Sequence, residues 1–444
     1  MKLLLVGALS WNPERVRSLC EAGHELWGLW SRTMAWEQGP YPVTEGCVRE
    51  VGLADAAETI RDQGIECVYS LFQAYDRRLW GPPSPGVEHG VWTLLRTLLE
   101  ERGRGRFDAP IVRHWGFDVH NLDPWVAEAL DGHVFCNREK LAYWSLPVAE
   151  GGRGLDVFGD EAGHLFTDGD MPKLEFMNDR FSAPLSEADG EIHTVCVGRP
   201  LGVDFLAAAQ RGIHVHVYSN SVDDVYRTIA GSLSVRAARR GAAVLDRYLH
   251  VHEPLQPAGS SWAEVRETKG KWVQEFSRYD AAWSYIGTPV AWDPLDDRSA
   301  IPNRLGTYLL AGLPVITDRR PGFYRHDEMN RLGADVELID SDYDSLRARL
   351  QEEVATRERR DNARAARHGY SFDATIDVLI GAFEAARERY FAQPHPARTR
   401  FEPRNSGRAV HFYTGRRRLR SALAQRRQLR APLTSRALAR SVEP

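Results

Sequence analysis

The chain has 444 residues, which at about 100–200 residues per domain suggests two domains. Its five cysteines are odd in number and none has CxxC spacing, which argues against a disulfide framework or a zinc site and favours a reduced, cytoplasmic protein. No run approaches the roughly 18 apolar residues that a membrane-spanning helix needs, so the sequence predicts no such helix.

The net charge of -4 is unevenly distributed. Residues 394–444 carry 13 Arg, no Lys and two acids, which leaves -15 on the rest of the chain. Leucines recur among these arginines, and a basic amphipathic segment of this kind can lie on anionic lipid. Disorder, folding back on the acidic body and non-specific binding of nucleic acid are the alternatives. We expect no specific nucleic-acid partner and keep peripheral contact with the inner face of a membrane as a hypothesis.

The first part of the chain alternates between short apolar runs and helical patterns. Expected strands cover 2–7, 24–31, 65–72, 109–115 and 133–137, and expected helices cover 13–22, 53–64, 91–102, 124–132 and 138–144. Pro13 stands at a first-turn position, where its missing N–H costs nothing. Such alternation predicts a doubly wound parallel sheet with helices on both faces.

The pattern breaks between about Pro147 and Glu191, where Gly, Asp and Pro are frequent, and a second α/β series then begins. Expected strands cover 193–200, 213–220, 280–287 and 313–318, and expected helices cover 204–212, 272–279, 303–312, 345–369 and 374–391. We therefore predict α/β domains over 1–185 and 190–375, and a tail over 393–444.

The segment IPNRLGTYLLAGLPVITD is the most informative. Apolar residues at helical spacing form one buried stripe, made of Leu305, Tyr308, Leu309 and Gly312. Pro302 and Asn303 are residue types that begin a helix, and Gly312 ends it before a buried strand. The free N–H groups at such a helix start suit a diphosphate, and Arg304 could add a charged contact. The alternative is an ordinary α/β unit whose Arg304 is merely solvated.

This segment resembles the donor-binding helix of GT-B glycosyltransferases. The residues that match the family pattern are Pro302, Arg304, Tyr308, Gly312, Pro314, Val315 and Ile316. The order of elements resembles the family over about residues 1–392. The resemblance implies two Rossmann-like domains facing across a cleft, a nucleoside-diphosphate-sugar donor, no metal and a helix over 376–392 that returns to the N-terminal domain. Many retaining members carry two Glu residues where this chain has Ser299 and Thr307.

The resemblance also implies a set of donor-binding positions. Gly198 and Arg199 end the first strand of the second domain, where the family faces the donor phosphates. Tyr285 and Gly287 lie in the loop that contacts the nucleobase. The first turn of the helix adds Asn303, Arg304, Leu305 and Thr307. A simple strand-ending turn and ordinary core packing are the alternative interpretations.

His250, His252 and Glu253 form a further polar group. Alternating histidines on a strand point to one side and could bind a metal, but the sequence offers no obvious third ligand. A contact of His252 or Glu253 with the donor or acceptor is the other functional interpretation. Polar residues at the end of a strand are the structural one.

In the first domain, the loop from Gly7 to Ser10 has no GxGxxG, which argues against a dinucleotide site. We expect this loop on the acceptor side. An acceptor hydroxyl needs a base, and candidates at strand ends are Asp76, His114 and Asp118. The stretch RHWGFD resembles the His-Gly-x-Asp turn of many GT-B enzymes, with an inserted Trp. Capping of a neighbouring helix is the alternative role for each.

The sequence therefore predicts a metal-independent glycosyltransferase without a cofactor, whose acceptor is a small molecule, a glycan or a protein. A nucleotide-sugar epimerase of the same fold and a non-catalytic nucleotide-sugar-binding protein are the alternatives. The acidic triplets 168–170 and 340–342 resemble the metal-binding motif of the other major glycosyltransferase fold, but neither follows a suitable buried strand, and we interpret both as turns.

Overall fold

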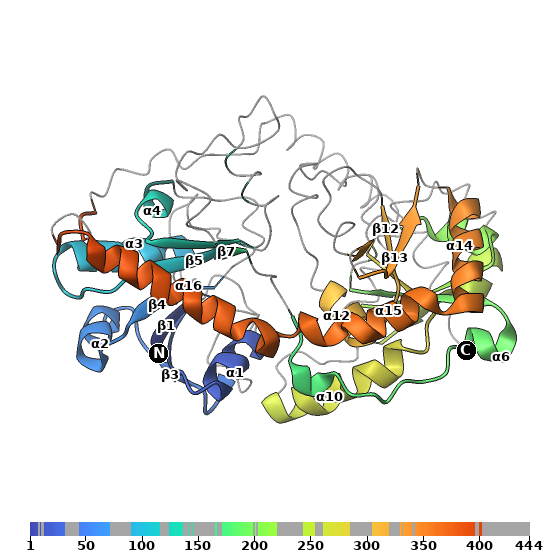
Figure 1. The fold of residues 1–444 in the computed structure, drawn as a ribbon, viewed down its shortest axis with the longest axis horizontal. Helices are drawn as coiled ribbons and strands as arrows, with labels where there is room; N and C mark the ends of the chain where they lie inside the picture. The colour runs from blue at the N-terminus through green and yellow to red at the C-terminus, as the bar shows by residue number, and fades with distance from the viewer. Residues whose placement is uncertain are drawn as a thin grey trace. The chain divides into compact units, whose positions relative to one another are not determined.

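The structure is a computed structural model. It describes residues 1–7, 9, 13–31, 44–71, 90–115, 124–135, 141, 145, 165–166, 171–198, 200, 203–219, 243–253, 261–284, 304–318, 329–330, 332–339, 342–395 and 399–401. The chain divides into two compact units (Figure 1). The first unit holds Met1–Lys173, Gly259–Glu264 and the described residues from Ser371 onward. The second unit holds Leu174–Ala258 and Val265–Tyr370.

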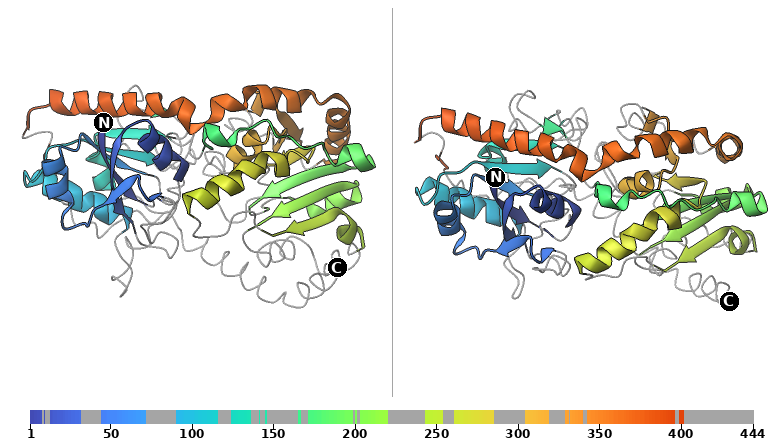
Figure 2. Two further views of the ribbon diagram at one scale, coloured as in Figure 1. Left: turned by 90° about the horizontal axis from the view of Figure 1, so that it is seen from below. Right: turned by 60° about the horizontal axis from the view of Figure 1, so that its bottom comes forward.

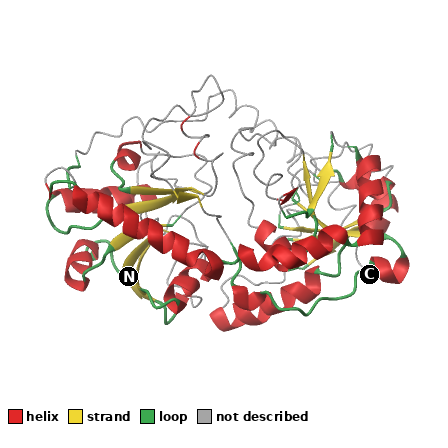
Figure 3. Ribbon diagram, viewed as in Figure 1, coloured by secondary structure: helices red, strands yellow, loops and turns green. Residues whose placement is uncertain are grey.

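The first unit is built on one parallel sheet (Figure 3). Its described strands are β1 (Lys2–Gly7), β2 (Glu25–Trp30), β3 (Val48–Glu50), β4 (Cys67–Ser70), β5 (Ile111–Trp115), β6 (Gly132–Phe135) and β7 (Leu165–Phe166). They are ordered β3-β2-β1-β4-β5-β6-β7, so the direction of winding reverses between β1 and β4. This is the strand order of a doubly wound Rossmann-like sheet.

Helices cover this sheet, and one of them comes from far along the chain. They are α1 (Pro13–Glu21), α2 (Ala56–Gln63), α3 (Val91–Gly103), α4 (Pro124–Glu128) and α16 (Phe372–Ala392). Leu19 of α1 and Phe383 of α16 share a core cluster with Leu5 of β1 and Tyr69 of β4. Figure 2 shows α16 lying along the first unit in both further views. The end of the described chain thus completes the core around its beginning.

The second unit repeats the same plan. Its described strands are β8 (Ile192–Val197), β9 (Ile213–Tyr218), β10 (Leu249–His252), β11 (Ala281–Trp283), β12 (Val315–Asp318) and β13 (Asp335–Leu338). They form a parallel sheet in the order β10-β9-β8-β11-β12-β13. Its helical elements are η7 (Leu174–Phe176), α6 (Ser186–Asp189), α7 (Phe205–Gln210), α10 (Trp262–Phe276), α12 (Arg304–Leu310), α14 (Tyr343–Thr356), α15 (Glu358–Ala366) and η8 (Arg367–Tyr370).

Alternate residues of the second sheet enter two different cores. Cys196 and Val217 join the cluster that includes residues of α7 and α14, whereas Val195 and Tyr218 join the cluster that includes residues of α10 and α12. On the latter face, three adjacent strands carry histidines in place of apolar residues. These are His193, His214, His216, His250 and His252.

The single long helix predicted over 345–369 is wrong, because the chain breaks at Arg357 into α14 and α15. Arg357 has φ +60, a left-handed backbone conformation that residues other than glycine rarely adopt. Its guanidinium donates to the Asp280 carboxylate, 2.8 Å away, and to the Ser186 hydroxyl at 3.1 Å. Asp280 is fully buried, so this ion pair helps to offset the backbone strain.

Other differences from the sequence prediction concern edges and boundaries. The strands β3, β7 and β13 were not predicted, and α10 begins ten residues before the predicted start. Asp342, in the second acidic triplet, accepts from the backbone N–H groups of Asp344 and Ser345 and thereby caps α14.

Candidate functional site

Two strand ends meet where the order of the second sheet reverses. β8 and β11 are neighbours there, and the chain continues from Val197 into Gly198 and from Trp283 into Ser284. In open parallel sheets, ligands bind outside the carboxyl ends of the strands at such a point. This edge is therefore the candidate ligand site of the second unit.

Tyr308 of α12 ties these two strand ends together. Its hydroxyl accepts the backbone N–H of Val197 at 3.0 Å and donates to the carbonyl of Trp283 at 2.9 Å. The side chain is fully buried, and this burial raises the pKa of the phenol. The hydroxyl therefore stays protonated at neutral pH and keeps its donor role. One buried side chain thus sets the separation of the strand ends on which a ligand would rest.

Gly198 begins the loop that follows β8. Its φ is +78, which favours glycine, and its N–H donates to the carbonyl of Tyr218 at 2.6 Å. No described atom lies within 4 Å of the place that a Cβ would occupy. The backbone therefore turns sharply at the candidate site and presents no side chain there.

Arg304 opens α12 beside the same strand. Its Nη1 lies 3.5 Å from the Sγ of Cys196, whose pKa is raised by burial, so the partner is a neutral thiol rather than a thiolate. The positive charge of Arg304 is thus held near the end of β8. Of the other predicted helix residues, Leu305 belongs to the core and Thr307 is half-buried.

Several predicted site residues lie outside the described residues, and their roles stay predictions. They are Arg199, Tyr285, Gly287 and Asn303 of the donor set, Asp76 and Asp118 of the catalytic set, and Ser10 of the acceptor loop.

Gly7 marks the corresponding reversal in the first sheet. Its φ is +130, and a Cβ there would lie 3.2 Å from the carbonyl oxygen of Leu71, the residue that follows β4. The chains leaving β1 and β4 therefore approach closely enough to require glycine. Gly7 thus lies at the carboxyl end of β1, where the strand order reverses, and its role in an acceptor-side loop stays a prediction.

His114 lies in the core of the first unit and is fully buried. Its Nδ1 accepts from Arg15 at 2.6 Å and from the hydroxyl of Tyr69 at 2.8 Å, so a neutral ring carries its proton on Nε2. Burial, followed by the charges of Arg15 and Arg113, holds the pKa of His114 well below its usual range. Contact with an acceptor would require this ring to become accessible, and its role as a base stays a prediction.

The neutral state of His114 predicts how stability depends on pH. The pKa of such a histidine is lower in the folded state than its value of about 6.5 in the unfolded state. The group has no effect on the free energy of unfolding well above pH 6.5, but it lowers that free energy as pH falls below about 6.5. His114→Asn keeps an acceptor for Arg15 and Tyr69 but does not titrate. We expect it to reduce the slope of unfolding free energy against pH by up to about 1.4 kcal/mol per pH unit below pH 6.5. Denaturant titrations between pH 5 and 8 measure this, and identical slopes in both proteins would contradict it.

His252 ends β10, and Glu253 follows it. His252 stacks on Tyr218 with ring centroids 4.4 Å apart, and its Nε2 lies 2.9 Å from Nδ1 of His216, while Glu253 is exposed. His250 and His252 were predicted from the sequence as candidate site residues, but their partners on β8 and β9 were not. In the described part of the chain, no group of three or more His, Cys, Asp or Glu side chains is arranged to hold a metal ion.

In sequence, no family profile and no curated protein matches the chain. Solved structures do match its fold. A glycosyltransferase from Rickettsia africae ESF-5 aligns with a TM-score of 0.54 and 8% identity, over 87% of this chain and 98% of its own. HepE from Anabaena, solved in complex with UDP, aligns with a TM-score of 0.51 and 11% identity, over 86% and 98%. The predicted GT-B fold, built from two Rossmann-like parallel sheets, is thereby confirmed.

Among the described residues, no helix has the length and apolar character to cross a bilayer. The Arg-rich stretch predicted as a tail lies almost entirely outside the described residues.

Proposed function

We propose that the protein is a glycosyltransferase that moves a sugar from a nucleoside-diphosphate sugar to an acceptor hydroxyl without a metal ion. The observation that carries this proposal is the structural match to the Rickettsia glycosyltransferase along nearly the whole of both chains. The complex of HepE with UDP supports a nucleotide ligand for the same architecture. A shared fold hosts many functions, so the proposal also rests on the polar groups at the reversal of the second sheet.

The donor diphosphate would bind at the ends of β8 and β11. Gly198 lets the backbone approach the phosphates, Arg199 follows it, and Arg304 supplies a second positive charge from α12. Asn303 precedes that helix, and Tyr285 and Gly287 would contact the nucleobase. Thr307 offers a hydroxyl where many relatives of this fold have a carboxylate.

The chemistry requires a leaving group and a base. The acceptor oxygen forms a bond to the anomeric carbon, the bond to the phosphate oxygen breaks, and the nucleoside diphosphate leaves with added negative charge. Arg304 would stabilise that charge as it develops. Because His114 is buried, we favour Asp76 or Asp118 for accepting the proton of the hydroxyl, on the unit that carries Gly7 and Ser10.

Arg304→Ala tests the phosphate site. We expect it to weaken binding of a nucleoside diphosphate by about 1.5–3 kcal/mol, the range for hydrogen bonds to charged groups. A thermal-shift screen of nucleoside diphosphates selects the tightest ligand, because a ligand of the native state raises the melting temperature, and calorimetry then measures the variant. Arg347→Ala, an exposed arginine of α14, is the matched control and should bind as the wild type does. Equal affinity for Arg304→Ala would overturn the site.

Product analysis tests the reaction itself. Incubation of the enzyme with labelled nucleotide sugars and an acceptor library should yield a labelled acceptor and a free nucleoside diphosphate. Conversion of the donor alone into an isomer would instead identify an epimerase. Tight binding without transfer or hydrolysis of any donor would identify a binding protein.

A further inference from the structure

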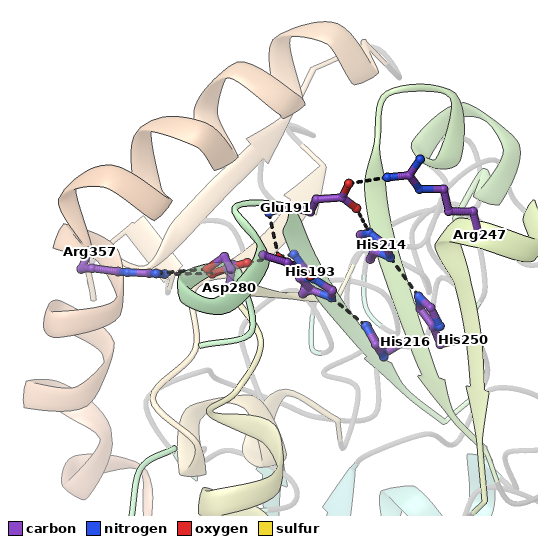
Figure 4. Close-up of polar contacts among 10 residues, drawn as sticks. Glu191, His193, His214, His216, Arg247, His250, Asp280 and Arg357 are labelled. Atoms are coloured by element: carbon purple, nitrogen blue, oxygen red, sulfur yellow. Dashed lines mark hydrogen bonds and ion pairs between the residues drawn. The ribbon is translucent and has the colours of Figure 1, made fainter. Parts of the chain in front are cut away.

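The histidines on β8, β9 and β10 form an ordered ladder (Figure 4). The strand register places His193 opposite His214 and His216 opposite His250. The rings of each pair stack with centroids 4.3 Å apart. This stacking holds the rings in fixed orientations, so their nitrogens have defined partners.

Hydrogen bonds join rings along the diagonals of the ladder and make a chain of three imidazoles. His193 Nε2 lies 2.9 Å from Oδ2 of Asp189 in α6. His193 Nδ1 lies 3.0 Å from Nε2 of His216, and His216 Nδ1 lies 2.9 Å from Nε2 of His252. The chain therefore runs from a carboxylate at the amino edge of the sheet to the carboxyl end of β10.

The carboxylate fixes the position of every proton in this chain. Asp189, when ionised, can only accept, so His193 donates from Nε2 and its Nδ1 must accept. His216 then donates from Nε2, and the same reasoning makes His252 donate from Nε2. All three neutral rings are Nε2–H tautomers, and Nδ1 of His252 is the terminal acceptor of the chain among the described residues.

A second, shorter chain lies beside the first. His250 Nε2 lies 2.9 Å from Nδ1 of His214, whose Nε2 bonds the carboxylate of Glu191. Arg247 also donates to Glu191, 2.5 Å away, and Tyr248 packs tilted against His214 with centroids 4.6 Å apart. The same reasoning makes His214 and His250 Nε2–H tautomers, and Nδ1 of His250 is the terminal acceptor of this chain among the described residues.

We propose that each imidazole chain is a proton relay, which binds one proton at its ring on β10 and delivers the positive charge to the ring beside the carboxylate. In the longer chain the proton adds to Nδ1 of His252. The Nε2 proton of His252 passes to Nδ1 of His216, and the Nε2 proton of His216 passes to Nδ1 of His193. His193 becomes an imidazolium next to Asp189, and the other two rings end as neutral Nδ1–H tautomers.

The surroundings favour this end state over a charge that stays inside the sheet. Burial lowers the pKa of His216, so this middle ring of the longer chain resists a lasting charge. Burial with neighbouring histidines lowers the pKa of His250, the terminal ring of the shorter chain, to about 4, so it resists a lasting charge as well. His193 faces the half-exposed carboxylate of Asp189, which stabilises an imidazolium.

At the far end of the chain, the surroundings of His252 also disfavour a charge that stays there. Burial lowers the pKa of His252, the charge of Glu275 opposes that shift, and Arg278 adds to it. Tyr218 stacks on His252, and Tyr279 lies against His216 with ring centroids 4.7 Å apart. Burial raises the pKa of both phenols, so neither tyrosine supplies a charge near neutral pH.

The relay does not depend on the proposed transferase activity, because it concerns proton binding by the folded chain alone. The test is nitrogen NMR of the full chain with ¹⁵N-labelled histidine, titrated from pH 8 downward. We expect Nε2–H tautomers for His193, His216 and His252 at pH 8. As pH falls, the doubly protonated signal should appear first at His193, while His252 and His216 change to Nδ1–H. Protonation that appears first at His252, without a tautomer change at His216, would overturn the proposal.

Asp189→Asn gives a second, independent readout. Removal of the carboxylate charge should lower the midpoint of the first protonation of the longer chain by about one pH unit. Glu187→Gln, an exposed neighbour on the same short helix, is the matched control and should leave the midpoint unchanged. An unchanged midpoint in Asp189→Asn would contradict the relay. If this variant does not fold, as judged by near-ultraviolet circular dichroism, the tautomer measurement on the wild type decides.

Discussion

Arg357→Ala is expected to lower the free energy of unfolding of the second unit by about 3–5 kcal/mol. The variant removes the ion-pair partner of Asp280, which is fully buried between α6 and the start of β11. Asp280 would keep the hydroxyl of Ser186 and the backbone N–H of His193 but lose the opposite charge. Alanine keeps the same left-handed backbone strain as arginine, so the loss reports on the ion pair.

Denaturant unfolding measures this effect, and a surface pair provides the control. Arg211 bonds the carboxylate of Asp344, which is 76% exposed, and Arg211→Ala should cost only about 0–1 kcal/mol. Arg357→Lys keeps the charge without the planar fork and should fall between the two. Equal losses for Arg357→Ala and Arg211→Ala would contradict the importance of the buried pair.

Phe383→Ala in α16 is expected to destabilise the first unit by about 3–5 kcal/mol, the usual cost of removing a buried aromatic side chain. Phe383 is fully buried and lies against the ring of Tyr69 with centroids 4.6 Å apart. Val378→Ala on the same helix is the control, because Val378 is 53% exposed and should change stability little.

Hydrogen exchange resolved by residue assigns these losses to a unit. Phe383→Ala should speed exchange in the strands of the first sheet and leave that of the second sheet unchanged. Uniformly faster exchange in both sheets would contradict the assignment of α16 to the core of the first unit.

Much of the fold could be predicted from local pattern. Apolar runs such as Lys2–Gly7 and the helix that begins at Pro13 alternate clearly, and alternation alone indicates a doubly wound sheet. The strands that escaped prediction are short and lie at or near the sheet edges. Val48–Glu50 is half-exposed, so it lacks the apolar signal of a strand covered on both faces.

The candidate site was predicted only in outline. The helical spacing of Leu305 and Tyr308 indicated correctly that both are buried. The bridging role of the Tyr308 hydroxyl could not be predicted, because it requires two strand ends that are distant in sequence. In the same way, Arg15 contacts His114 although the two residues are 99 positions apart in the sequence, and no local pattern reveals that the ring is enclosed.

The histidine ladder shows what the sequence did contain. The strands read IHTVCV, IHVHVY and LHVH, with one histidine in the first and two histidines at alternate positions in each of the others. Period two indicates that these rings share a face, but their stacking depends on the register between β8, β9 and β10. Only the assembled sheet converts three separate patterns into one hydrogen-bonded array.

The position of α16 has a consequence for the order of events during synthesis. The second unit is formed mainly by Leu174–Ala258 and Val265–Tyr370, so it can fold as soon as Tyr370 has left the ribosome. The first unit, although made earlier, must wait for Phe372–Ala392 before its apolar sheet face is covered. The residues translated first are thus the last to reach a finished core, and a nascent chain stopped before residue 372 should expose Leu5 and Tyr69 to chaperones.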